Sequence, residues 1–169
     1  YGTTGTGTSN HMAAELFKAM AGIDMVRINY KSTSGALTDL IAGQLHISFH
    51  TVPSVAAHVQ AKRLRALGVS GAQRSAALPE LPTIASTGLP GYESVSTLCI
   101  FAPAATPAAV VHRLNMEIVR FLNIPDTKVR LLNAGAEVVA STPEEFAAYI
   151  KAEIAKWGDV IRKAGLKAD

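Results

Sequence analysis

The chain has 169 residues, of which 49% are hydrophobic and 17% are charged. This composition supplies a buried core and excludes an intrinsically disordered chain. No uninterrupted apolar run reaches about 18 residues, the length that indicates a membrane-spanning helix. The net charge of +3 suits an anionic ligand, but the basic residues are scattered and lack interleaved aromatics, which argues against a nucleic-acid partner. Cys99 is the single cysteine, so we expect no internal disulfide and no metal cluster.

Helices and strands are predicted to alternate through the first 70 residues. A Thr/Gly-rich loop over 2–8 precedes a helix over 9–21, which Gly22 terminates. The following elements are a strand over 24–30, a helix over 35–42 capped by Ser34, a strand over 45–50, a helix with Pro53 in its first turn, and a strand over 64–70. Three consecutive helix–strand units predict an α/β fold with a parallel sheet and right-handed crossovers.

The alternation of helices and strands stops at 71–92. This stretch is rich in turns and has one short helical piece, and we interpret it as a connection between two structural halves. The remaining elements are a strand over 93–103, a helix from Thr106-Pro107 to Leu122, a short helix from Pro125 to before Gly135, a brief strand over 138–139, and a helix ending at Ala164. The last helix begins with a capping box, Thr142-Pro143-Glu144-Glu145.

The opening loop is the strongest candidate for a binding site. Its predicted ligand contacts are Thr3, Thr4, Gly5, Thr6, Gly7 and Thr8, which lead directly into a helix N-terminus. Free amides at such a terminus favour an anion, glycine permits close approach, and threonine hydroxyls add donors. The loop matches neither the P-loop nor the dinucleotide fingerprint, which needs glycine where Asn10 stands. A plain glycine-rich turn is the alternative interpretation.

Two further segments are expected at the same edge of the parallel sheet. Ser32 and Thr33 follow one strand, and His50 and Thr51 follow the next, so we predict that all four contact the ligand. Helix capping by Ser34 explains part of this polarity without a ligand. We expect the ring of His11 to brace the opening loop.

No feature of the sequence favours an enzyme. A nucleophile paired with a base, a His/Cys/carboxylate group at metal-binding spacing, and a Gly-x-Ser-x-Gly elbow are all missing from the sequence. We therefore predict binding without chemistry, no catalytic residue, no metal and no cofactor.

Short stretches in a shared order extend over some 160 residues and resemble the Bug family, the TctC-like solute receptors of tripartite tricarboxylate transporters. They are 1–11, Tyr30-Lys31-Ser32, 36–40, Ala42-Gly43-Gln44, 62–67, Arg74-Ser75, Leu81-Pro82-Thr83, Gly88-Leu89-Pro90-Gly91-Tyr92 and 101–107. Each stretch alone is weakly specific, whereas their common order is specific.

The resemblance implies a periplasmic-binding-protein-like fold of type II, a two-domain Venus flytrap. Residues 1–98 would form most of the second domain, and 99–169 would return to complete a first domain whose leading part precedes this chain. The ligand would be a small carboxylate, either a di- or tricarboxylate or an amino acid, held in the cleft between the domains. The resemblance also implies a periplasmic location and membrane transporter subunits as partners.

Two departures from the family pattern concern the predicted site. The family usually has Asp where His50 stands and Gly where Ser32 stands. We hypothesise that His50 favours a more anionic ligand, or one without an ammonium group. Three alternatives stay open: a receptor for sensing rather than uptake, the effector-binding domain of a LysR-type regulator, and a small α/β enzyme that uses the same anion loop.

Overall fold

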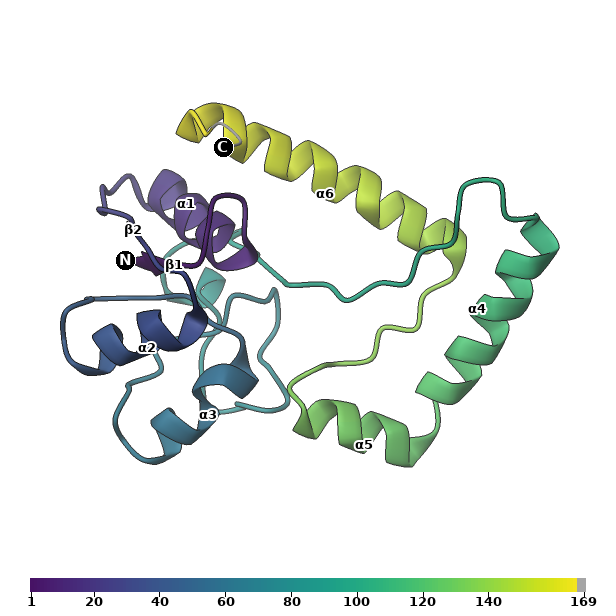
Figure 1. Cartoon of the computed structure of the whole chain (residues 1–169), viewed down its shortest axis with the longest axis horizontal. Coiled ribbons are helices and arrows are strands. Elements are labelled where there is room, and N and C mark those ends of the chain that lie inside the picture. The colour runs from purple at the N-terminus through teal and green to yellow at the C-terminus, as the bar shows by residue number, and fades with distance from the viewer. Residues whose placement is uncertain (167–169) are drawn as a thin grey trace. The chain divides into compact units, whose positions relative to one another are not determined.

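The computed structural model describes residues 1–166 (Figure 1). Its elements are β1 (Gly2–Thr3), α1 (Ser9–Ala21), β2 (Ile28–Asn29), α2 (Thr33–Ile41), α3 (Val52–Gln60), the 3₁₀ turn η1 (Ala85–Thr87), α4 (Ala108–Leu122), α5 (Pro125–Asn133) and α6 (Pro143–Ala164). They form two compact units, one made of Tyr1–Ser96 with the stretch from Trp157 onward, and the other of Thr97–Lys156. Among the described residues, no helix is both long enough and apolar enough to cross a lipid bilayer.

A small parallel sheet lies at the centre of the first unit. β1 pairs with β2 in parallel, with Gly2 opposite Ile28 and Thr3 opposite Asn29. On its other side, Gly2 forms a parallel bridge with Ser48. The resulting order, with β1 in the middle, confirms the predicted parallel α/β arrangement, and Figure 1 shows α1 on one side of the strands and α2 on the other.

The predicted strands are much shorter in the structure. The strand expected over 24–30 is reduced to the two residues of β2, and those over 45–50 and 64–70 are reduced to single bridges at Ser48 and Val69. The strands expected over 93–103 and 138–139 are irregular backbone. An alternating apolar pattern indicates which side chains one face of a strand could bury. A strand also needs a neighbouring backbone segment with which it can form hydrogen bonds.

The helices follow the predicted boundaries closely. α1 covers 9–21, and Gly22 terminates it in the left-handed conformation at φ 64°. The capping box of α6 is reciprocal, since Thr142 N–H donates to Glu145 Oε2 at 2.9 Å and Glu145 N–H donates to Thr142 Oγ1 at 3.1 Å. Helix ends depend on local hydrogen bonds of this kind, which explains why the sequence predicts them well.

One predicted cap is wrong. Ser32, not Ser34, is the N-cap of α2, because the Ser32 hydroxyl accepts a hydrogen bond from Gly35 N–H at 3.2 Å. The helix begins at Thr33, two residues before the predicted start. Ser34 lies inside the first turn, and its hydroxyl is 3.0 Å from that of Ser32.

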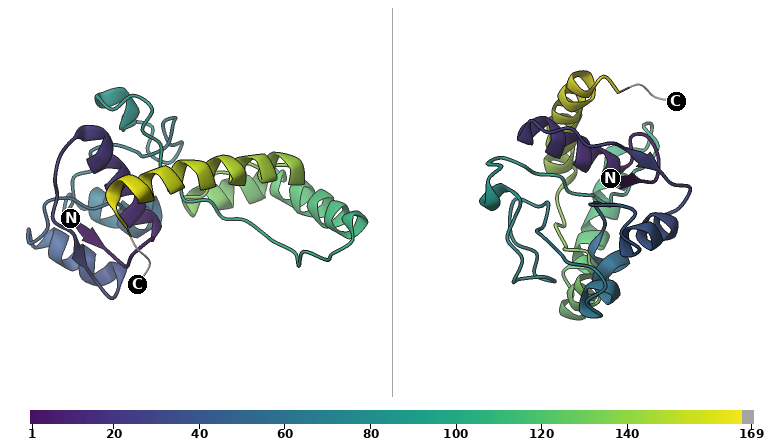
Figure 2. Two further views of the ribbon diagram at one scale, coloured as in Figure 1. Left: turned by 90° about the horizontal axis from the view of Figure 1, so that it is seen from above. Right: turned by 90° about the vertical axis from the view of Figure 1, so that its left-hand side faces the viewer.

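The core of the first unit joins α1 to residues far along the chain. Met12 and Leu16 of α1 pack with Tyr92 and Val160, and the Tyr92 hydroxyl donates to Ala13 O at 2.9 Å. The C-terminal end of α6, which carries Val160, lies beside α1 in both figures (Figures 1 and 2). The turn-rich stretch over 71–92 therefore ends at Tyr92, a buried residue that fixes this stretch against α1.

The second unit is held by aromatic contacts and a few hydrogen bonds. The rings of Phe101 and Phe146 lie 5.6 Å apart, and the hydroxyls of Thr97 and Tyr149 are 2.7 Å apart. Large apolar side chains remain exposed in the extended segments of this unit, with Leu98 90% and Val139 84% exposed. Burial in this unit therefore comes mainly from its helices.

Replacing Gly2 with alanine should destabilise the fold. The added Cβ would lie 2.6 Å from the Cδ1 of the buried Leu45, so the core beside β1 must shift. We expect Gly2→Ala to lower the free energy of unfolding by about 1–3 kcal/mol. Gly158→Ala is the control, because the helix α6 has room there and should gain about 0.5–1 kcal/mol. Urea unfolding followed by circular dichroism measures both, and equal stability of Gly2→Ala and wild type would contradict the packing argument.

Candidate ligand-binding site

The carboxyl ends of the parallel strands bring three polar segments to one edge of the first unit. The opening loop follows Thr3 at the end of β1, the segment starting at Tyr30 follows β2, and His50 and Thr51 follow the bridge at Ser48. From β1 the chain passes to β2 on one side, and it later returns to the Ser48 segment on the other side of β1. The boundary between β1 and the Ser48 segment is therefore a topological switch point of the sheet. Open parallel α/β sheets bind ligands in the crevice at such a point.

The opening loop is shaped by two glycines and by hydrogen bonds within it. Gly5 and Gly7 have φ values of 136° and 76°, which residues with a Cβ rarely adopt. The Thr8 hydroxyl donates to Gly5 O at 2.9 Å. Asn10 Oδ1 accepts from this same hydroxyl and from His11 N–H at 3.0 Å. Glycine freedom and local side-chain contacts together turn the chain sharply into α1.

The first amides of α1 remain available. Thr8 is the N-cap but makes no side-chain cap hydrogen bond. Within residues 1–166, the backbone N–H groups of Ser9 and Asn10 have no hydrogen-bond acceptor, and Ser9 is exposed. These donors lie at the positive end of the helix dipole, where an anion gains roughly 0.3–1 kcal/mol from the dipole alone.

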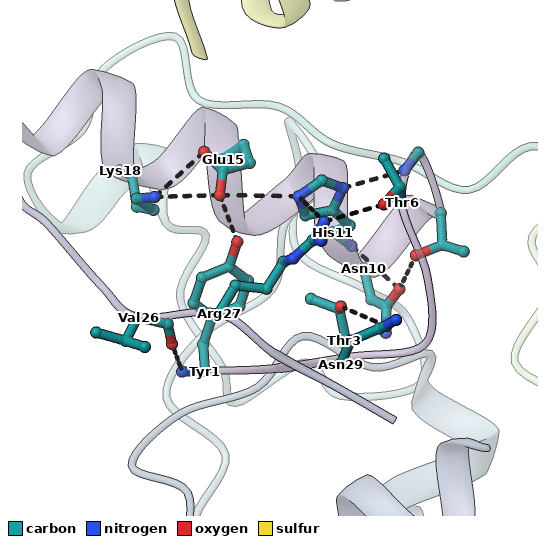
Figure 3. A network of polar contacts seen from close by, with 12 residues as sticks. Tyr1, Thr3, Thr6, Asn10, His11, Glu15, Lys18, Val26, Arg27 and Asn29 are labelled. Carbon is teal, nitrogen blue, oxygen red and sulfur yellow. Dashed lines mark hydrogen bonds and ion pairs between the residues drawn. The ribbon is translucent and has the colours of Figure 1, made fainter. Parts of the chain in front are cut away.

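His11 braces this loop from the inside, as predicted. Its side chain is fully buried, and Gly7 N–H donates to its Nδ1 at 3.1 Å (Figure 3). Nδ1 therefore acts as an acceptor, and the other ring nitrogen, Nε2, is 3.8 Å from Glu15 Oε1. Arg27 Nη1 is 3.1 Å from the same Nε2 and donates to Thr6 Oγ1 at 3.2 Å, linking the loop to the segment before β2.

A buried carboxylate anchors the opposite side of this cluster. Glu15 is 7% exposed and accepts hydrogen bonds from the Tyr1 hydroxyl and from Lys18 Nζ, the latter at 3.1 and 3.3 Å. Burial, followed by this contact with Glu15, raises the pKa of Tyr1. Figure 3 shows these groups as one continuous network with His11 and Arg27. A pocket of about 390 Å³ opens beside them, but its charged groups pair mainly with one another.

The sequence interpretation missed most of this network. His11, Glu15 and Lys18 are spaced by four and by three residues, so they share one face of α1. That spacing could have predicted a paired cluster behind the loop. The contribution of Arg27 has no comparable sequence pattern, because it depends on the return of the chain to β2.

The predicted contact residues differ in their exposure. The Thr3 side chain is fully buried, and its hydroxyl is 3.5 Å from Asn29 Oδ1. Thr4, Gly5, Thr6 and Thr8 are half-buried, whereas Gly7, Ser32, Thr33 and Thr51 are exposed. The Ser32 hydroxyl already serves as a helix cap, and the Thr51 hydroxyl donates to Ser54 Oγ at 3.3 Å. Their role in ligand binding stays a prediction.

His50 is half-buried and differs from the other residues at this edge. Its Nε2 is shut off from water and has no hydrogen-bond partner among the described residues. Burial lowers the pKa of His50. The neighbouring Phe49 packs against the core around Met12, which fixes the backbone at this position.

The free energy of unfolding should decrease as the pH falls, because the fold disfavours protonation of His11 and His50. Burial first, and then Arg27, lower the pKa of His11. The unfolded chain then binds more protons than the folded one near and below the ordinary histidine pKa of about 6.5, so stability decreases as pH falls through that value. We expect a slope of at most about 1.4 kcal/mol per pH unit for each histidine.

His11→Asn tests this, because asparagine Oδ1 can still accept from Gly7 N–H. Urea unfolding between about pH 7.5 and pH 5.5 should give a shallower slope for His11→Asn than for wild type, and a still shallower slope with His50→Asn added. Identical slopes in the wild type and the double variant would show that neither histidine is held neutral by the fold.

Comparison with known proteins gives a consistent result. The family model described as tripartite tricarboxylate transporter family receptor, TctC, matches residues 1–166. A UPF0065 protein in the tcbD-tcbE intergenic region of Pseudomonas sp. (strain P51) is 38% identical over 170 residues, which cover 100% of this chain and 51% of that relative.

Two solved structures share the fold. R. palustris Rpa4515 with adipate has 36% identity and a TM-score of 0.84, covering 98% of this chain and 55% of that one. The periplasmic binding protein BugD has 26% identity and a TM-score of 0.77, covering 99% and 57%. The chain thus spans about half the length of these relatives. The parallel α/β arrangement is that of a periplasmic binding protein, and the chain belongs to the tripartite tricarboxylate transporter family of receptors.

Proposed function

We propose that this chain is the ligand-binding part of a periplasmic receptor that captures a small carboxylate for uptake. The observation that carries the proposal is a pair of amides at the end of a braced glycine loop, Ser9 N–H and Asn10 N–H, which have no acceptor within residues 1–166. They lie at the edge of the sheet where α/β proteins bind ligands. The net charge of +3 favours the approach of an anion.

The proposed ligand class is an aliphatic dicarboxylate. Rpa4515, the relative with 36% identity, was solved with adipate. One carboxylate would accept hydrogen bonds from the α1 amides and the hydroxyls of Thr4 and Thr6, and the rest of the ligand would extend toward His50. The site needs no chemical step, because capture alone is the function. Membrane transporter subunits are the proposed partners of the ligand-bound receptor.

The expected affinity follows from the size of these interactions. Each hydrogen bond to a charged group contributes about 1.5–3 kcal/mol, and the helix dipole adds up to about 1 kcal/mol. Two such bonds at the lower end of this range, together with the dipole, contribute about 4 kcal/mol, which corresponds to a dissociation constant near 1 mM. One wall of a cleft should bind a carboxylate weakly, and a second wall closing over it would add the remaining affinity.

Titration with adipate followed by amide chemical shifts tests the proposal, since it detects millimolar binding residue by residue. We expect saturable shifts at the amides of Ser9 and Asn10 and in the loop before them. Adipamide, the neutral diamide, is the control ligand and should cause much smaller shifts because it lacks the negative charge. Equal shifts with both ligands, or no shifts with adipate, would overturn the proposed function.

A pair of glycine variants distinguishes an effect on the binding site from a general effect of backbone strain. Gly5→Ala and Gly22→Ala both place a Cβ at positive φ, and neither Cβ meets an atom closer than 3.6 Å. Both should lower stability by about 1 kcal/mol. Only Gly5→Ala should also weaken adipate binding, by about tenfold, because Gly5 shapes the anion loop and Gly22 ends α1. Equal adipate affinities in the two variants would show that the opening loop is not part of the binding site.

A further inference from the structure

The Nε2 of the half-buried His50 is the one buried side-chain polar atom in residues 1–166 without a hydrogen-bond partner. This atom is closed to water. The second ring nitrogen, Nδ1, is neither closed off in this way nor hydrogen-bonded within the same residues. The two nitrogens of this ring therefore lie in different surroundings, one dry and one accessible.

This difference determines where the ring hydrogen lies. A neutral imidazole carries one N–H donor and one bare nitrogen acceptor. Among backbone groups, orphaned buried N–H donors are rarer in proteins than under-satisfied carbonyl acceptors, and we apply the same preference to the ring nitrogens. The hydrogen therefore belongs on Nδ1, where a partner can reach it, and the bare nitrogen is the buried Nε2. His50 then carries a single accessible N–H donor, at the edge of the sheet where the chain turns into α3.

We propose that His50 is a specificity-determining residue of this site, which offers a neutral Nδ1–H donor to an oxygen of the ligand and rejects a ligand ammonium group. The inference rests on the proposed function, and it names which carboxylates the receptor selects. A carboxylate, carbonyl or hydroxyl oxygen can accept from Nδ1–H, whereas an ammonium group has only donors and would face a donor.

The His50 ring should stay neutral, with its hydrogen on Nδ1, across the neutral pH range. A second ring proton would have to sit on Nε2, where it would be a buried N–H without an acceptor. Burial lowers the pKa of His50, and no charged side chain of the described residues contributes to that change. The preference for an oxygen over an ammonium group should therefore be unchanged between about pH 6.5 and pH 8.

Adipate and 2-aminoadipate form the matched ligand pair, because they differ by one ammonium group on the same carbon chain. Wild type should bind adipate more tightly by about tenfold or more. His50→Asn should preserve this preference, since the asparagine amide can donate from nearly the position of Nδ1. His50→Leu should reduce adipate affinity and shrink the preference, and His50→Asp should abolish or reverse it, because the carboxylate accepts from an ammonium group and repels adipate.

Long-range nitrogen–proton spectra give a readout that needs no ligand. They distinguish the two tautomers of each histidine, and the exposed His46 and His112 serve as references in the same spectra. We expect His50 to be the Nδ1–H form. A hydrogen on Nε2 would overturn the inference, as would an unchanged adipate preference in His50→Asp and His50→Leu.

The failure of this inference can be distinguished from the failure of the proposed function. If wild type binds adipate and the His50 variants keep the same preference, only the role of His50 is wrong. If wild type binds neither ligand, the receptor proposal fails and the role of His50 fails with it. Thermal unfolding of each variant shows that it is folded, and the tautomer of the wild type gives a result even where a variant does not fold.

Discussion

The hydrogen bond from Gly7 N–H to the buried His11 ring is the constraint on which the opening loop depends. It joins a glycine-rich turn, which alone would be mobile, to the first turn of a packed helix. Because Nδ1 accepts this bond, His11 must stay neutral, and burial with the neighbouring Arg27 disfavours its charged form. The chemistry that fixes the loop therefore also makes its stability sensitive to acid. The amides of Ser9 and Asn10, which have no acceptor within residues 1–166, lie in the chain between the two residues that this bond joins.

The helices could be predicted from the sequence because their ends depend on nearby residues. Gly22 at the end of α1 and the reciprocal Thr142–Glu145 box at the start of α6 are complete within a few residues. The strands could not be predicted to their full extent, because pairing depends on backbone elsewhere in the fold. The segment over 93–103 alternates as a strand should, yet the described residues provide it with no neighbouring strand.

The positions of the opening loop and of His50 in the fold were predicted, but the contacts among the residues around them were not. The order of loops and strands is sufficient to place the opening loop and His50 at one edge of a parallel sheet. Spacing along α1 indicates that Glu15 can reach His11 and Lys18, but not that Glu15 is buried. The Nε2 of His50 has no partner in the part of the chain that the structure describes, and no sequence pattern could predict this, because it depends on which groups the fold places beside the ring.

Affinity and selectivity would have different physical origins in the proposed site. Backbone amides at a helix N-terminus bind almost any anion, because each supplies the same donor and the dipole responds only to charge. A side chain with one fixed donor responds to what the ligand carries beyond its carboxylate. In the proposed site, a ligand ammonium group would change little at the α1 amides, since the carboxylate remains, but it would place donor against donor at His50. Under the proposed function, selection among carboxylates would therefore come from residues such as His50, while the loop would supply the general attraction for an anion.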